Sequence, residues 1–120
     1  MEEKSSITAL MSAFGRAFHT ENEKLPVFRD DKAKCFFSDD EYKAMCGYVL
    51  GGMDFFAPEK KGSFVNDKEA LRYIANTQIV PTPEARAAFT EESLKTAVMT
   101  GTRQYVIIGA GFDPSKKTFF

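Results

Sequence analysis

The sequence predicts a mainly α-helical protein that ends in one β-strand belonging to an α/β sheet. Three observations predict this class. Apolar residues recur at the three- and four-residue spacing of helices over most of the chain. At residues 104–108 the pattern changes to a short continuous apolar run, which is typical of a buried parallel strand. The chain has 120 residues, of which 43% are apolar and 12 are phenylalanine, so it can form the core of one domain.

The first predicted helix covers residues 6–20, after a polar start that lacks the basic and apolar regions of a signal peptide. One face of this helix is apolar: Ile7, Leu10, Met11, Phe14 and Phe18. We expect the stripe of Met11, Phe14 and Phe18 to pack in the core or in a lid rather than to line a substrate pocket. His19, the single histidine, lies at the end of this helix, where a cation suits the helix dipole. Asp30 and Asp31 are predicted to cap a short helix over residues 33–37.

Capping signals predict the next two helices. Ser38 followed by Glu41 is a capping box, so we expect a helix from there to about Met53. Asn66 or Asp67 caps a further helix of about two turns, because apolar residues follow at helical spacing.

The remaining segments are predicted from prolines, glycines and a change of period. Residues 54–66 carry both breakers without a period, and we expect a loop that buries its two aromatics, Phe55 and Phe56. Residues 79–84 predict a sharp break, with Thr82 as the N-cap of the last helix and Pro83 at its first position. Gly101 is expected to end this helix in a left-handed conformation.

Composition excludes several classes of function. The chain has 16 Lys and Arg against 17 Asp and Glu, for a net charge of −1, and it lacks the basic excess of a nucleic-acid domain. No apolar run reaches the roughly 18 residues of a membrane span. Cys35 and Cys46 fit no metal-ligand spacing, so we expect no metal site. We interpret them as buried, reduced thiols of a cytoplasmic protein, with one disulfide as the alternative.

The most informative motif follows the predicted strand: Gly109-Ala110-Gly111-Phe112-Asp113. Glycines after a strand permit a tight turn and let a ligand approach the backbone. Pro114 stands where the dinucleotide fingerprint has its third glycine, which disfavours NAD and FAD. A simple turn is the alternative interpretation of this glycine pair.

This motif, with the strand before it, resembles the first motif of S-adenosylmethionine-dependent methyltransferases of the leucine carboxyl methyltransferase type. That family shows an apolar strand running into Gly-Ala-Gly, an apolar residue and Asp. Further stretches are similar to the family's earlier motifs in the same order: residues 6–11 with 16–17, residues 28–33 and residues 85–89. The resemblance covers nearly the whole chain.

The resemblance implies a class I, Rossmann-like α/β methyltransferase whose sheet is incomplete in this chain. Residues 1–101 would form a helical N-terminal or cap region, and residues 102–120 the first strand with the Gly-rich cofactor loop. It also implies S-adenosyl-L-methionine as cofactor of the parent enzyme. The residues expected to bind it are Arg86, Gly109, Ala110, Gly111 and Asp113. Arg86 would bind the carboxylate and Asp113 the ammonium; the alternatives are a solvated helix arginine and a turn aspartate.

The implied reaction is methyl transfer to an oxygen, such as a carboxylate oxygen, of an acceptor that the sequence does not specify, and no catalytic residue is assigned. The resemblance places the ribose-binding acidic residue beyond a second strand. We therefore expect the 120-residue chain alone to be inactive and to bind the cofactor weakly or not at all. We also expect a homo-oligomer through residues 104–120, because a lone strand needs partners for its backbone. The alternative function is a non-enzymatic helical interaction domain.

Overall fold

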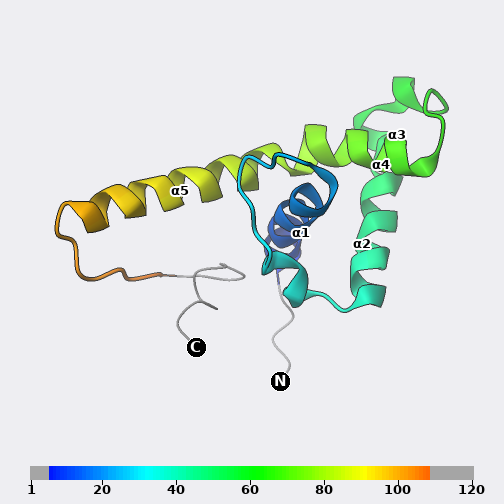
Figure 1. The fold of residues 1–120 in the computed structure, drawn as a ribbon. Helices are drawn as coiled ribbons and strands as arrows, with labels where there is room; N and C mark the ends of the chain where they lie inside the picture. Colours follow the sequence, from blue (N-terminus) through cyan, green and yellow to red (C-terminus); the bar gives the residue numbers. More distant parts are fainter. Residues whose placement is uncertain (1–5, 109–120) are drawn as a thin grey trace.

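The computed structural model describes residues 6–108, and these residues form a helical body from which one long helix extends (Figure 1). No helix among them is long and apolar enough to cross a membrane. The elements are, in chain order, α1 (Ile7–Asn22), η1 (Ala33–Phe36), α2 (Asp39–Gly51), α3 (Met53–Phe56), η2 (Pro58–Lys60), α4 (Asp67–Ile74), η3 (Ala75–Ile79) and α5 (Pro81–Met99).

Helix α1 supplies the centre of the core and packs against η1, η3 and α5. Phe14 and Phe18 are buried on its apolar face, and Met11 packs against them from the edge. The predicted role of this stripe in the core is therefore confirmed. The buried apolar cluster joins α1 to α2, α3, α4 and η3, and its members are Phe14, Phe18, Val49, Met53, Ala57, Ile74, Ala75 and Val80.

Both capping predictions for the middle of the chain are confirmed. The Glu41 amide donates to Ser38 Oγ at 3.2 Å, and the Ser38 amide donates to Glu41 Oε2 at 2.7 Å, so the capping box that starts α2 is complete. At the start of α4 the Glu69 amide donates to Asn66 Oδ1 at 2.9 Å. Asn66, rather than Asp67, is thus the cap.

The segment after α2 differs from the predicted loop in two respects. It contains the short helix α3 and the 3₁₀ turn η2. Phe55 and Phe56 are 81% and 51% exposed, so the expectation that they are buried is wrong. In this segment Met53 and Ala57 fill the core instead, because one turn of helix directs residues four apart to the same face.

Helices α4 and α5 are joined by a π-helical turn, η3, and not by the predicted sharp break. The Val80 amide donates to the Ala75 carbonyl, five residues back, at 2.9 Å. Val80 keeps helical dihedrals (φ −68°, ψ −43°), and Pro81 takes the first position of α5. Thr82 occupies the second position of the helix and is therefore not its N-cap. Pro83 occupies the third position and not the first. Neither proline loses a bond there, since amides of a first turn have no intrahelical acceptor.

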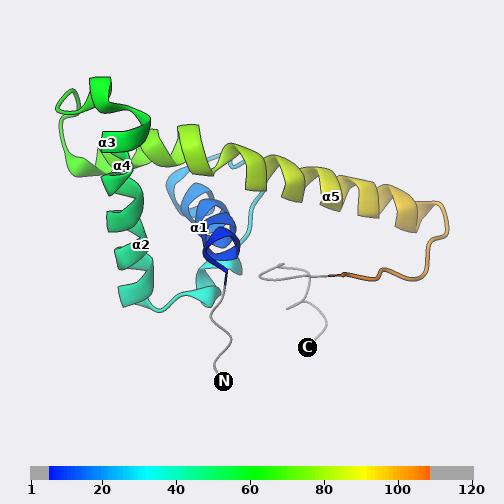
Figure 2. The same ribbon diagram turned by 180° about the vertical axis from the view of Figure 1, so that it is seen from behind.

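The end of α5 agrees with the prediction, because Gly101 adopts φ +105°. The Thr102 amide donates to the Ala97 carbonyl at 3.0 Å and the Gly101 amide to the Val98 carbonyl at 3.2 Å. These two bonds form a Schellman motif, which requires the left-handed residue that glycine supplies. The chain then turns back toward the helical body (Figure 1, Figure 2).

Residues 104–108 are not in a β-strand, although the sequence predicts one there. A strand requires a neighbour that accepts and donates its ladder hydrogen bonds. No segment of the described part of the chain provides that neighbour. The apolar side chains Val106 and Ile108 are accordingly exposed.

Both cysteines are free thiols, as the main interpretation expected. Cys46 is half-buried on α2, where burial raises the pKa of its thiol. Cys35 is exposed, so the prediction of burial is wrong for this residue. Residues 33–36 form a single 3₁₀ turn, which is too short to bury all of its side chains.

Candidate functional site

Arg86, the predicted cofactor-binding arginine, lies in the second turn of α5, and its side chain is exposed. No carboxylate in residues 6–108 forms an ion pair with it. An exposed guanidinium without a protein partner can offer its planar fork to an anionic group. The other four predicted cofactor residues lie outside the described part of the chain: Gly109, Ala110, Gly111 and Asp113.

A cluster of polar side chains lies between α1, the loop of residues 23–32 and the first turn of α5. We call it the polar cluster, and its members are Arg16, His19, Asp30 and Glu84. The residues Arg16, Asp30 and Glu84 are all less than 10% exposed. Charged residues are seldom buried so fully unless they are paired, so each contact in this cluster matters for the fold.

Arg16 and Asp30 form the buried ion pair of the cluster. Arg16 Nε donates to Asp30 Oδ2 at 3.0 Å, and Arg16 Nη1 donates to Ser12 Oγ at 2.8 Å. Asp30 Oδ1 accepts from the amides of Lys32 and Ala33 at 3.1 and 2.9 Å, so it holds the turn that leads into η1, although the N-cap position is Lys32 and not the predicted Asp30 or Asp31. The pair joins the two N-terminal sequence motifs, because one contributes the arginine and the other the aspartate. Breaking such a pair would leave an uncompensated buried charge.

Glu84 ties α5 to the loop. Its side chain is 2% exposed, and its Oε2 accepts a hydrogen bond from the Phe28 amide at 2.9 Å. Its Oε1 is buried without a hydrogen-bond partner. Burial raises the pKa of Glu84 to about 7, although the Phe28 amide and the nearby Arg16 act in the opposite direction. Asp30 adds to the increase, since two like charges disfavour each other.

His19 is nearly buried in the last turn of α1, where the sequence placed it. The Val27 amide donates to His19 Nε2 at 3.1 Å. His19 Nε2 also lies 3.8 Å from Glu84 Oε2. Among the described residues, the buried His19 Nδ1 has no hydrogen-bond partner. The role of His19 as a charge at the helix end stays a prediction.

The contacts of the polar cluster join parts of the fold, and its side chains are not arranged as a catalytic site. Its hydrogen bonds link α1 and α5 through the backbone amides of the intervening loop. Within the described residues no group of three or more metal-ligating side chains is present. The cluster can hold the first turn of α5 against the helical body, and it thereby sets the position of the helix that carries Arg86.

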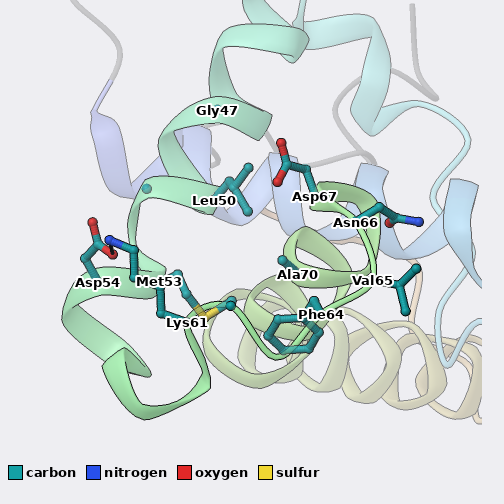
Figure 3. A pocket seen from close by; sticks show the side chains of 12 residues that line it. Gly47, Leu50, Met53, Asp54, Lys61, Phe64, Val65, Asn66, Asp67 and Ala70 are labelled. Atoms are coloured by element: carbon teal, nitrogen blue, oxygen red, sulfur yellow. Dashed lines mark ion pairs between the residues drawn. The ribbon is translucent and has the colours of Figure 1, made fainter.

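A separate hollow of about 540 Å³ lies between α2, α4 and the loop that precedes α4 (Figure 3). Its base is apolar, with Leu50, Met53 and Phe64, and Lys61 pairs with Asp54 at its edge at 2.7 Å. It is wide open to solvent and lies at the opposite end of the molecule from the C-terminal half of α5 (Figure 1). We therefore place the candidate site at Arg86 and not in this hollow.

Sequence reasoning missed Glu84 and the partnership of Arg16 with Asp30. Glu84 follows Pro83 in a first helical turn, where an acidic residue is expected to be solvated and to favour the helix dipole. Nothing local distinguishes a buried glutamate from that ordinary case. Arg16 and Asp30 both lie in motifs of the resemblance. Arg16 interrupts the apolar stretch of residues 13–18, which was a signal for a buried partner, whereas Asp30 stands among other charged residues and nothing local marks it as that partner.

Comparison with known proteins gives the family. The model of the leucine carboxyl methyltransferase family matches residues 9–116. The protein YktD of Bacillus subtilis (strain 168), named as an S-adenosyl-L-methionine-dependent methyltransferase, is 37% identical over 111 residues. That alignment covers 92% of this chain and 36% of YktD, so the chain spans about a third of its relative. No solved structure matches the chain. The chain therefore belongs to the leucine carboxyl methyltransferase family.

Proposed function

We propose that this chain is the N-terminal portion of an S-adenosylmethionine-dependent methyltransferase that methylates an oxygen, such as a carboxylate oxygen, of its acceptor. The observation that carries the proposal is the family match over residues 9–116. The name of YktD supports S-adenosylmethionine as the cofactor. Arg86 on α5 is exposed and has no ion-pair partner among residues 6–108, which supports a role in binding it. Family membership also favours this function over a non-enzymatic interaction domain.

The residues of the chain fit the amino-acid end of the cofactor. Arg86 offers two parallel N–H donors, which match a carboxylate. Asp113 supplies the acceptor for an ammonium, and the run from Gly109 to Gly111 offers backbone without bulky side chains. The bound cofactor supplies an electrophilic methyl group on its sulfonium. The contribution of the protein is to bind, to orient and to exclude water.

The test is a calorimetric titration of S-adenosylmethionine, and of its demethylated product, into the full-length protein that the gene encodes. Arg86→Ala is expected to weaken binding by about 1.5–3 kcal/mol, the scale of a charge-assisted hydrogen bond, which is roughly 10- to 150-fold. Arg86→Lys should recover only part of this loss, because an ammonium cannot form the planar fork.

Lys95→Ala is the matched control. Lys95 is an exposed cation on the same helix, paired only with Glu91 at 3.5 Å, so its removal should leave the affinity within about twofold. Equal affinity of wild type, Arg86→Ala and Arg86→Lys would reduce Arg86 to a solvated surface residue. Reading the nucleotides after the codon for Phe120 tests the larger claim, since a methyltransferase requires an open frame for further strands and helices.

A further inference from the structure

Among the described residues, α5 contacts the helical body near its first turns and then extends away from it (Figure 1). Residue 15 of α1 is a glycine, and a Cβ there would lie 3.2 Å from Pro83 Cγ, so the two helices are in close backbone contact. Farther along, the large apolar side chains Phe89, Val98 and Met99 are exposed. The direction of α5 therefore depends on what holds residues 81–84.

Glu84 makes the polar part of that attachment. It accepts from the Phe28 amide at 2.9 Å, and it is the side chain of α5 that reaches into the polar cluster. The charged and titratable groups around it are Arg16 and His19 from α1 and Asp30 from the loop.

Helical geometry links Glu84 to the direction of Arg86. Successive residues are about 100° apart around the axis, so two residues separate the side chains by about 200°. Glu84 faces the body, and Arg86 accordingly projects to the opposite side, in agreement with its exposure. Any rotation of α5 about its axis would change where Arg86 points.

We propose that Glu84 is a positioning residue for Arg86, whose buried carboxyl fixes the rotation of α5 through the Phe28 amide. This inference rests on the proposed function of Arg86. A purely structural role explains Glu84 poorly. Among the described residues, one oxygen of its buried carboxyl has no partner, which lowers stability, and an apolar side chain at this position would avoid that cost. The acceptor at Oε2 is what an apolar side chain cannot supply.

Two variants separate positioning from stability. Glu84→Gln keeps an oxygen acceptor for the Phe28 amide, and it should bind S-adenosylmethionine within about threefold of wild type. Glu84→Met has a similar volume and no such acceptor. It should retain the thermal stability of wild type or exceed it, and yet bind the cofactor about tenfold more weakly. Reduced affinity without reduced stability is the signature that a merely structural role would not produce.

A measurement without ligand separates this inference from the proposed function. Nitroxide labels are attached to the variants Lys43→Cys on α2 and Ala85→Cys on α5, two exposed positions. The distance between the labels, measured by pulsed electron paramagnetic resonance, reports the placement of α5. Cys35 and Cys46 are replaced by serine for this experiment. We expect one narrow distance distribution in wild type and Glu84→Gln, and a broader or displaced one in Glu84→Met.

An unchanged distribution in Glu84→Met would overturn the positioning role, and so would an unchanged affinity in that variant. Absence of cofactor binding in the full-length wild-type protein, with the distance still dependent on residue 84, would instead overturn the proposed function and leave Glu84 as the residue that sets the direction of α5.

Discussion

Glu84 combines burial with a pKa close to neutrality, and this makes the stability of the protein depend on pH. Its pKa is about 7 in the folded chain and 4.5 in its ordinary environment. Between these values the folded chain binds more protons than the unfolded chain at this residue. Its contribution to the free energy of unfolding therefore falls as the pH rises from 4.5 to 7.

Glu84→Gln removes this dependence, since an amide does not ionise. At pH 8 the variant should be more stable than wild type by on the order of 1–3 kcal/mol, and below pH 4.5 the two should converge. Chemical denaturation between pH 4 and pH 8 measures the difference. A constant gap between the two proteins over that range would show that Glu84 does not titrate there.

The roles of single residues were predictable where they depend on neighbours in the sequence, and not where they depend on tertiary contacts. The capping residues Ser38 and Asn66 each accept from the amide three positions away, and both predictions are confirmed. His19 and Glu84 take their properties from the loop of residues 23–32, which lies far from Glu84 in sequence. Periodicity and capping rules contain no information about such contacts.

At the scale of elements, two glycines in helix interiors have opposite surroundings. A Cβ added at Gly47 of α2 would meet nothing within 4 Å. A Cβ at Gly15 of α1 would lie 3.2 Å from Pro83 Cγ and 3.4 Å from the Ile79 carbonyl oxygen. A rigid ring and a backbone atom can yield only by moving α5 away from α1.

Gly47→Ala should therefore stabilise the protein by about 0.5–1 kcal/mol, since alanine is the better helix former. Gly15→Ala gains the same propensity but overpacks the contact of α1 with α5 at a cost of about 1–3 kcal/mol. We expect a net loss of about 1 kcal/mol. Thermal melts of both variants measure the two effects, and stabilisation by Gly15→Ala would mean that α5 is loosely held.

Helices with capping signals and a clear period were predicted well, and junctions were not. The start of α5 was placed two residues late, because a π turn carries the helical path from Ile74 through Val80 without a cap. A residue before proline normally avoids helical dihedrals, so Val80 gave the appearance of a break. The strand at residues 104–108 failed for another reason, since the described chain offers no second strand to pair with it.

At the scale of the whole molecule, the helical class was predicted from periodicity, and the structure agrees with it over residues 6–108. The division at residue 101 and the Rossmann-like parent come from the resemblance and stay predictions. The candidate site stays a prediction. Arg86 lies on the exposed side of its helix, which suits a ligand-binding arginine and a solvated one alike, and the other four residues lie outside the described part of the chain.

Exposed apolar side chains after α5 lead us to propose self-association. Val106 and Ile108 are 77% and 93% exposed, and they lie in a segment whose backbone lacks a ladder partner within the described residues. Such edges associate with one another. Light scattering at micromolar concentration should show a dimer or larger species of wild type and a monomer of the double variant Val106→Asp, Ile108→Asp.

Thr102→Asp serves as the control for added charge, because Thr102 is exposed and lies in the Schellman motif before the apolar segment. It should remain associated. A wild-type chain that is monomeric under these conditions, with rapid amide exchange across residues 105–108, would contradict the proposal.

Bending at the π turn between α4 and α5 would move the far end of α5 much more than its first turn. Its 19 residues extend for about 28 Å, so each degree of bending at η3 displaces the far end by about 0.5 Å. A bend of a few degrees at η3, where the Val80 amide donates to the Ala75 carbonyl, would move Thr102 by a distance comparable to the length of a hydrogen bond. Small rearrangements beside the polar cluster are thereby amplified where the chain leaves α5 toward its glycine motif.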